Sequence, residues 1–371
     1  AAVGWIVQAT AGRKYLLLLA ISFFFMATGA FFGIFEEVIP LVPLMVALSY
    51  SLGWDALVGL GMSILATNMG FSAAITNPFT IGVAQRLAGL PLFSGAWLRV
   101  LIFLAIYGIL AVFLVGYARK IERPMGEAPG DEDQFASGRH SPPASLSQRV
   151  PHIGRALAWL SACLVLILAT LFSTPFIPAI AQLSLPLVGL LFFVGGIGAG
   201  FLSGAPGKAV LASAKEGAVS VLPAIPLVLM AASAKHIVTQ GGILDTLLHR
   251  ASQSINQTSP LLAALLVYLL VLVMDFFVTS GSAKAFLIMP VLLPLADLVG
   301  VTRQVAVTAY CFGDGFSNLA YPTSPVLLIC LGLTVVSYPK WLKWTLGLWP
   351  WVFLITAFFL AIGVWIGYGP F

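Results

Sequence analysis

The sequence predicts an all-α integral membrane protein. Of its 371 residues, 60% are hydrophobic and 8% are charged, and the mean hydropathy is +1.03. Soluble domains carry about 25% charged residues, so a soluble fold of this size would not hide so much apolar surface. The apolar runs have the length of spanning helices, about 17–25 residues. They do not alternate with period two, which argues against a transmembrane barrel.

The charged and metal-binding residue types give no sign of nucleic-acid binding or of a cofactor. The net charge is +5, the pI is about 9.2, and the chain has no basic run. In a membrane protein this excess indicates positively charged cytoplasmic loops. The three cysteines, Cys163, Cys311 and Cys330, form no CxxC pair, and the four histidines show no ligand spacing. We therefore expect no disulfide, no metal site and no cofactor.

One hydrophilic stretch divides the chain. Residues 117–147 are rich in Pro, Gly, Ser and mixed charge, which is typical of a flexible loop. Arg119 and Lys120 follow directly on the apolar run 101–116, so the positive-inside rule places this loop in the cytoplasm of a multi-pass protein of the cell (inner) membrane. The expected organisation is a first repeat in 1–117, a cytoplasmic linker in 118–152 and a second repeat in 153–371.

The two halves resemble each other. When residues 31–99 are set beside residues 277–343, several residue types coincide at a nearly constant offset of 247 or 244. The coinciding pairs are Pro43 with Pro290, Gly53 with Gly300, Pro78 with Pro322, Leu87 with Leu331, and Trp97 with Trp341. Membrane transporters are frequently built from internal repeats of this kind.

The charges at the helix ends predict that the repeats are inverted. The helix after Trp97 ends at Arg119 and Lys120, whereas its counterpart begins near Lys340 and Lys343 and ends without charge. The two helices should therefore cross in opposite directions. Inverted repeats place a binding site at the bilayer midplane, between the halves.

The two halves differ in how much sequence precedes the repeated unit. Two apolar segments, 155–174 and 186–203, and the region 205–250 precede the repeated unit in the second half. Only 14 residues without an initiator Met precede it in the first half. We expect the native chain to extend further N-terminally by a few helices. An asymmetric protein is the alternative.

Each repeat contains a first polar interruption, GAFFGIFEEVIP (29–40) and DFFVTSGSAKAF (275–286). The apolar arms that follow, PLVPLMVAL and LIMPVLLPLA, are too short to cross about 30 Å at 1.5 Å per residue. Such arms suit two re-entrant hairpins, whose tips leave helical geometry only where protein or water satisfies the backbone. The tip residues expected to face a wet internal cavity are Glu36, Glu37, Thr279, Ser280, Ser282 and Lys284.

A second interruption follows the next helix, NMGFSAAITNPFT (68–80) and DGFSNLAYPTSP (314–325). Both contain Gly-Phe-Ser, and both contain proline, which removes an amide donor and breaks a helix. We predict two broken helices whose freed carbonyls and half-helix ends line a site for an ion and a small charged solute. Its polar side chains would be Thr76, Asn77, Thr80, Asp314, Asn318, Thr323 and Ser324.

The charged candidates each have two interpretations. Acids at the membrane centre cost about 2.5–3.5 kcal/mol, so Glu36 and Glu37 are expected to bind a proton, sodium or a substrate amino group. The alternative is a solvated pair near the interface. Lys284 would bind a substrate carboxylate or Asp314, or it would form an internal salt bridge without a ligand. Asp275 is expected near the interface, and Asp314 would coordinate an ion or cap the following half-helix.

The neutral candidate residues also have two interpretations each. Oxygens and amides of Asn77, Asn318, Thr323 and Ser324 suit recognition of a carboxylate or of sodium. They would also cap broken helix ends, and both roles are compatible.

An enzyme and a channel are the competing functions. Ser280, Ser282 and Lys284 could suggest a Ser–Lys dyad, and CFGDG resembles the Gly-x-Gly-Asp motif of intramembrane aspartyl proteases. However, Cys311 stands at the first glycine, no HExxH pair occurs, and a dyad does not explain the repeat. No helix carries the continuous polar stripe that a channel needs. The sequence therefore predicts a transporter and no enzyme.

Four segments carry a family resemblance: GAFFGIFEEVIPLVPL, NPFTIGVAQRLAGLPLFSG, SGSAKAFLIMPVLLPLADLVGVTRQ and FGDGFSNLAYPTSPVLL. Together they resemble the YfcC-type, DcuC-like carriers, which are grouped with the anaerobic four-carbon-dicarboxylate carriers and with arginine/ornithine-type antiporters in the ion transporter superfamily. The likeness covers nearly all of residues 14–371. It implies inverted repeats, two opposed hairpins, a scaffold domain that forms a homodimer, and a transport domain that moves like an elevator.

By the same resemblance, the tips at Glu36–Glu37 and Ser280–Ser282 and the breaks at 77–78 and 318–324 would form the site. The chain lacks the N-terminal helices of the family and the Ser-Asn-Thr tip triplet of the sodium–dicarboxylate branch, which argues against sodium–dicarboxylate symport.

The predicted function is secondary active transport of a small carboxylate-bearing metabolite across a lipid bilayer. The paired acids at one tip and the single lysine at the other favour a basic or zwitterionic amino acid, carried by exchange or by coupling to Na⁺ or H⁺. The alternative is a C4-dicarboxylate or short-chain carboxylate carrier.

Overall fold

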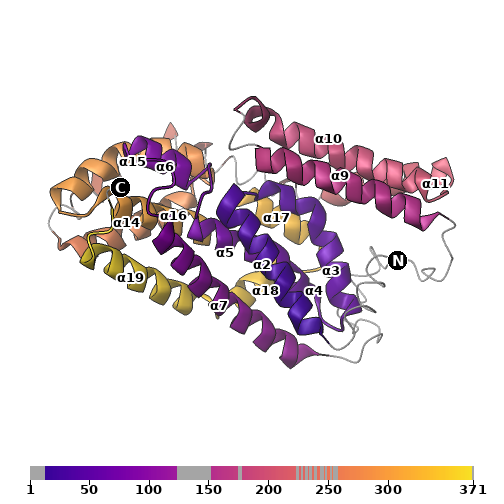
Figure 1. The fold of residues 1–371 in the computed structure, drawn as a ribbon, viewed down its shortest axis with the longest axis horizontal. Coiled ribbons are helices and arrows are strands. Elements are labelled where there is room, and N and C mark those ends of the chain that lie inside the picture. The colour runs from indigo at the N-terminus through magenta and orange to yellow at the C-terminus, as the bar shows by residue number, and fades with distance from the viewer. Residues whose placement is uncertain are drawn as a thin grey trace.

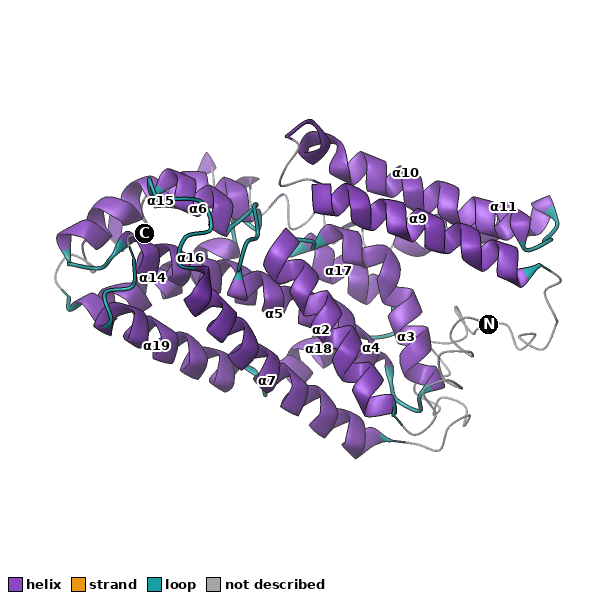
Figure 2. Cartoon of the chain, viewed as in Figure 1, coloured by secondary structure: helices purple, strands orange, loops and turns teal. Residues whose placement is uncertain are grey.

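A computed structural model describes residues 13–122, 152–173, 178–222 and 258–369, with scattered positions between 225 and 253. The described residues form helices joined by turns and loops, and they contain no strand (Figure 2). This confirms the predicted all-α class.

The first half runs from a long helix through a short hairpin to a buried broken helix and a second long helix. Its elements are α2 (Lys14–Phe32), the 3₁₀ turn η1 (Glu36–Leu41), α3 (Val42–Ser51), α4 (Ala56–Leu60), the π-helical turn η2 (Gly61–Leu65), α5 (Ala66–Ala73), α6 (Ile81–Leu87) and α7 (Ala96–Ile121).

Among the described elements, the second half has three helices before the segment that is predicted to repeat. The additional helices are α9 (Ile153–Ser173), α10 (Pro178–Leu202) and α11 (Gly207–Val221). The later elements are α14 (Pro260–Asp275), α15 (Gly281–Leu298), α16 (Arg303–Ser317), α17 (Pro325–Gly332), α18 (Tyr338–Thr345) and α19 (Trp349–Trp365).

Local sequence signals fix where several helices begin and end. Asp55, Ser280 and Thr302 each accept a backbone N–H in the first turn of α4, α15 and α16. α14, α17, α18 and α19 have proline in their first turn, where the missing N–H costs nothing. At the other end of a helix, Gly33 adopts a left-handed φ of 69° and stops α2 just before the first hairpin.

Four described helical segments are long and apolar enough to cross a membrane. They are Lys14–Phe32, Ala56–Ala73, Ala96–Ile121 and Gly281–Leu298, and a fifth arises if α18 and α19, bent by 50°, form one span. The length of α15 differs from our expectation, since the apolar arm LIMPVLLPLA was predicted to be too short to span. The helix starts earlier because Ser280 caps it, and it continues through Pro290 and Pro294 for 18 residues.

The helices α5 and α16 lie at the centre of the fold. The segment Ala56–Ala73 is entirely buried, and so is every residue of α16 from Gln304 to Ser317. The helices α2 and α7 pack on α5, and α14 and α19 pack on α16 (Figure 1). Close approach depends on glycine, because a Cβ at Gly70 would collide with the carbonyl of Met26, and one at Gly313 would lie 2.7 Å from Val271.

The two halves are joined by crossed contacts. The helix α15 of the second half packs on α6 of the first, and η1 of the first half packs on α17 of the second. Each hairpin segment therefore rests on the half-helix that follows the break in the other half.

The helices α9 and α10 lie side by side in an outer layer (Figure 1). The helix α9 covers the predicted apolar segment 155–174 up to Ser173, and α10 begins eight residues before the predicted segment 186–203. Much of 205–250 lies outside the described residues. The helix α7 continues to Ile121, and residues 123–151 of the predicted linker also lie outside. Hydrogen bonds from Lys14 and Tyr15 lower the pKa of the Glu122 carboxyl just beyond the end of α7.

Candidate functional site

The first break, residues 74–80, is held against the end of α2 by its own polar groups. Ala74 ends α5 with a positive φ of 43°. The Thr76 N–H donates to the Ala30 carbonyl over 3.1 Å, and its hydroxyl donates to Phe31 over 2.9 Å. Asn77 Oδ1 accepts the N–H of Phe79 at 2.9 Å and of Thr80 at 3.3 Å. Thr76 and Asn77 therefore use their side chains to shape the loop.

The second break, residues 318–324, is held mainly through its backbone. Trp341 Nε1 donates to the Leu319 carbonyl over 2.8 Å, and the Tyr338 hydroxyl donates to Ala320. Asn318 Nδ2 donates to the carbonyl of Asp314 over 2.9 Å. These bonds fix the path of the chain but leave most side-chain oxygens of the break unused.

Three side-chain oxygens of this break are buried without a hydrogen-bond partner among the described residues: Asn318 Oδ1, Thr323 Oγ1 and Ser324 Oγ. The Ser324 side chain stands at the N-cap position of α17 but donates and accepts no capping bond. A buried oxygen without a partner costs about 1–3 kcal/mol, so such groups gather where a ligand supplies the missing partner.

The two breaks come together at the helix ends that precede them. A Cβ on Gly315 would lie 2.5 Å from Ser72 Cα, so α16 touches α5 one residue before α5 ends. At the other end of the first break, Thr80 approaches the second hairpin, because a Cβ on Gly281 would lie 2.9 Å from both Thr80 Cγ2 and Asp314 Oδ2. The second tip and both breaks therefore share one region.

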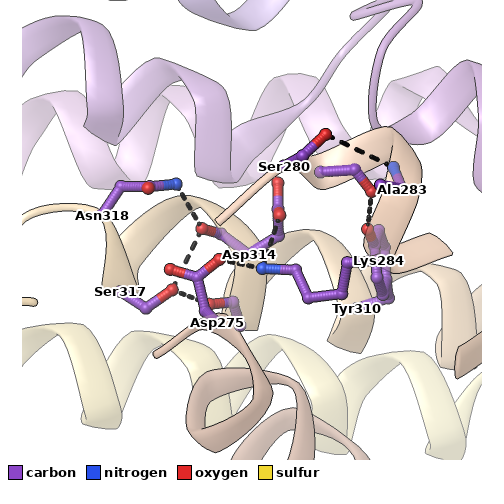
Figure 3. Close-up of polar contacts among 10 residues, drawn as sticks. Asp275, Ser280, Ala283, Lys284, Tyr310, Asp314, Ser317 and Asn318 are labelled. Carbon is purple, nitrogen blue, oxygen red and sulfur yellow. Dashed lines mark hydrogen bonds and ion pairs between the residues drawn. The ribbon is translucent and has the colours of Figure 1, made fainter. Parts of the chain in front are cut away.

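A fully buried ionic cluster lies beneath the second tip (Figure 3). Lys284 Nζ forms ion pairs with Asp275, the last residue of α14, and with Asp314 Oδ1 on α16 at 2.9 Å, and all three side chains are 0% exposed. We call Asp275, Lys284 and Asp314 the ionic cluster. Asp275, expected near the interface, is buried in an ion pair. One expectation is corrected: Asp314 lies inside α16, three residues before its end, rather than capping α17.

The tip residues above the cluster are more open. Ser280 is exposed, and its hydroxyl accepts the N–H of Ala283 at 3.5 Å, while Thr279 and Ser282 are half-buried. The Tyr310 hydroxyl, which comes from α16, donates to the carbonyl of Gly281 and ties the tip to the central helix. Among the tip residues of the second hairpin, Lys284 is the one committed to an internal ion pair.

The acids of the first tip are placed differently from each other. Glu36 is exposed, whereas Glu37 is half-buried and accepts the N–H of Phe35 at 3.1 Å. Both begin η1, which packs against α17 immediately after the second break. The two carboxylates therefore lie on an element that contacts the half-helix beginning after Ser324.

Arg99 on α7 has a structural part in the site that the sequence analysis did not identify. Its guanidinium is 1% exposed and donates to three backbone carbonyls, those of Ile75, Phe93 and Ser94, and to the Tyr368 hydroxyl at 3.2 Å. The bond to Ile75 holds the first break. An arginine within the apolar run after Trp97 was the available signal, because buried charges in spanning helices are expensive.

A cavity of about 190 Å³ lies beside Tyr368, the hydroxyl partner of Arg99. It is lined by Gly95, Trp97 and residues 366–369, near the C-terminal end of the described chain.

Known proteins resemble the chain over almost its whole length. A model of the family described as C4-dicarboxylate anaerobic carrier matches residues 1–365. YfcC of Escherichia coli (strain K12), a proposed basic amino acid antiporter, is 34% identical over 348 residues, which are 91% of this chain and 68% of that protein. An uncharacterized protein of Haemophilus influenzae (strain ATCC 51907 / DSM 11121 / KW20 / Rd) is 24% identical over 97% of this chain and 70% of its own length.

A solved structure shares the fold. The Alcanivorax borkumensis YdaH transporter, described as having an unusual topology, aligns with a TM-score of 0.53 and 18% identity, covering 100% of this chain and 82% of that one. At this identity the similarity concerns the fold alone. Together the comparisons indicate a membrane transporter rather than an enzyme.

Proposed function

Because the chain belongs to the C4-dicarboxylate anaerobic carrier family, we propose that it carries a small carboxylate-bearing metabolite by secondary active transport, and in particular a basic or zwitterionic amino acid. The family membership supports the carboxylate. The proposed role of the relative YfcC in basic amino acid antiport supports the amino acid.

The second break carries this proposal. Within the described part of the chain, the hydroxyls of Thr323 and Ser324 are buried donors without acceptors, and Asn318 Oδ1 is a buried acceptor without a donor. A substrate carboxylate would accept from the hydroxyls beside the N-terminus of α17, whose free N–H groups favour a negative charge. The ammonium of an amino acid would donate to Asn318. One break therefore contains the complementary groups for a zwitterion.

The remaining site groups favour a positive charge on the substrate side chain. Lys284 is held by two aspartates, so we no longer assign it to the substrate carboxylate. Glu36 and Glu37 place two carboxylates on η1, the element that packs against α17. They would attract a second ammonium or a guanidinium, as found in lysine, ornithine and arginine.

For the mechanism, we propose alternating access by an elevator-type movement of inverted repeats. The shared order of elements in the two halves and the crossed contacts of α15 with α6 and of η1 with α17 support two related repeats. The outer pair α9 and α10 would belong to a scaffold that dimerises.

A ligand panel on the purified protein tests the substrate class. We expect L-arginine, L-ornithine and L-lysine to raise the Tm, since a ligand of the native state stabilises it by about 2.7 kcal/mol at one hundred times its Kd. Stabilisation by succinate or malate, but by none of the three amino acids, would reverse the substrate assignment in favour of a dicarboxylate carrier.

Uptake into proteoliposomes tests transport itself. Vesicles preloaded with unlabelled L-arginine should take up radiolabelled L-arginine by exchange, and empty protein-free vesicles should not. Absence of exchange for every compound that stabilises the protein would contradict secondary transport of an amino acid.

A further inference from the structure

We propose that the ionic cluster binds one proton, shared between the carboxylates of Asp275 and Asp314, and that this proton is the ion coupled to transport. The proton would move from water onto a carboxylate oxygen and leave again to water, with no other bond made or broken. The proposal rests on the proposed function for the coupling step, whereas proton binding itself is independent of the substrate.

The geometry of the cluster sets its charge. Lys284 contributes one positive charge, and the two aspartates contribute two negative charges when both are ionised. All three side chains are 0% exposed, and they come from three helices, α14, α15 and α16. A fully ionised cluster therefore leaves one negative charge buried without compensation.

No group that faces the cluster in the described part of the chain supplies the missing positive charge. From α16 the titratable neighbours are Tyr310 and Cys311, and from the second break the neighbour is Tyr321. Each is neutral or would become negative. The second tip is tied to the Tyr310 hydroxyl.

The helices that pack around the ionic cluster do not supply the missing positive charge either. α5 and α19 contain no charged residue, α14 adds the neutral Tyr268, and on α15 Asp297 is paired with Arg303 at 2.7 Å. Arg86 on α6 is exposed, and the guanidinium of Arg99 on α7 is bound to carbonyls and to Tyr368. The N-terminus of α15 adds about half a positive charge at most.

A buried charge without a counter-charge costs several kcal/mol, and binding of one proton would neutralise this charge. Two carboxylates that share a site behave as one unit with one strongly held proton. Asp314 Oδ2 is also buried without a hydrogen-bond partner. A sodium ion is less suited, because the ammonium of Lys284 already contacts both carboxylates and would repel a second cation.

The position of the cluster explains how its proton would be linked to transport. Gly281, the first residue of α15, lies against both Asp314 Oδ2 and Thr80, so the ionic cluster, the second tip and the first break meet at one glycine. Loss of the proton changes the charge under these segments by a full unit. Any movement that opens the tip to water on one side would thereby couple proton release to solute movement.

Infrared difference spectroscopy of the purified protein tests proton binding without any substrate. The wild type should show the carbonyl stretch of one protonated carboxylic acid at pH 7, with the isotope shift in D₂O that identifies it. Asp275→Asn and Asp314→Asn should each remove the band completely. In each variant the negative charge of the remaining carboxylate is balanced by the positive charge of Lys284, so no proton needs to bind. Lys284→Met should double the intensity of the band, because both buried carboxylates then lack a counter-charge and should each bind a proton.

The matched control is Asp297→Asn on α15, which should leave the band unchanged because that carboxylate is exposed and paired with Arg303. If one Asp→Asn variant fails to fold, the other and Lys284→Met still give opposite expectations. A wild type without the band, or a band that survives in both Asp→Asn variants, would overturn the proton site.

Proteoliposomes with radiolabelled L-arginine test the coupling. One coupled proton converts a gradient of one pH unit into about a tenfold shift in the steady-state distribution of arginine. Asp314→Asn should lose this shift, whereas the control Asp297→Asn should retain both arginine exchange and the shift. A wild type that exchanges arginine without responding to the pH gradient would refute the coupling. A wild type that shows the infrared band but moves no amino acid would refute the proposed function and leave the proton site standing.

Discussion

Gly315 of α16 lies directly against Ser72 of α5, and this contact joins the two central helices at the point where both are about to break. The helices cross closely enough that a single methyl group would intrude on the backbone of the partner. The relative position of the two breaks is therefore set by one residue without a side chain.

Substitution of that glycine should destabilise the protein. We expect Gly315→Ala to cost about 1–3 kcal/mol, because its Cβ would lie 2.5 Å from Ser72 Cα. The measurement is the Tm of the detergent-purified protein. Gly108→Ala on α7 is the control, because nothing lies within 4 Å of a Cβ there. Equal Tm values for the two variants would show that the contact is looser than described.

The hydroxyls of the second break should matter for ligand binding and not for folding. Ser324→Ala and Thr323→Val remove oxygens that have no partner in the structure, so the Tm of the ligand-free protein should stay the same or rise slightly. The Tm increase produced by L-arginine should shrink markedly. A lower Tm without ligand would mean that these hydroxyls form structural bonds. Thr334→Val is a useful comparison, because its hydroxyl already donates to Leu331 over 3.0 Å.

Removal of the Glu37 charge should weaken binding of a cationic substrate more than of a neutral one. Glu37→Gln keeps an oxygen that accepts the Phe35 N–H, so the tip should retain its shape. The KM for L-arginine exchange should rise by about tenfold or more, the size expected when a charged hydrogen bond worth about 1.5–3 kcal/mol is lost. Unaltered arginine exchange in this variant would remove Glu37 from the site. Glu36→Gln measures the contribution of the exposed neighbour.

Arg99 should be needed for stability because it satisfies three carbonyls at once. Arg99→Met leaves the carbonyls of Ile75 and Phe93 without the guanidinium donors, which should cost at least about 2 kcal/mol. The Ser94 carbonyl would still accept from Gln85 and Gln304. Arg99→Lys should recover only part of the loss, because a lysine ammonium cannot match the planar fork of five donors. Arg86→Met, at an exposed position, should change the Tm little. A stable Arg99→Met variant would contradict this assignment.

The sequence predicted the helical membrane class and the positions of both breaks, because these depend on local signals. Pro78 and Pro322 each remove an amide donor and disfavour a continuous helix through 74–80 and 318–324, although α15 continues through Pro290 and Pro294, so proline alone does not decide where a helix breaks. The structure shortens each predicted interruption, since Asp314 to Ser317 and 68–73 remain helical. Helix geometry persists there because both segments are completely buried between other helices.

Pairing across the structure could not be predicted in the same way. The partner of Asp275 is Lys284, nine residues away on α15, which also pairs with Asp314 near the end of α16. Nothing in the run DFFVTSGSAKAF distinguishes a buried aspartate from an interfacial one. The sequence analysis allowed Lys284 a bond with Asp314 but did not include the second aspartate. Likewise, the unpartnered oxygens of Thr323 and Ser324 become visible only once all neighbouring donors and acceptors are placed.

The crossed contacts also bear on how the protein is made. η1 packs on α17, which begins 325 − 41 = 284 residues later along the chain. Ribosomes add about 5–20 residues per second, so the first tip would wait on the order of 15–60 s for its neighbour. During that interval Glu36 and Glu37 would sit in a nascent chain without the element that finally covers them. Biogenesis of this carrier should therefore depend on insertion factors that shelter unfinished polar segments in the bilayer.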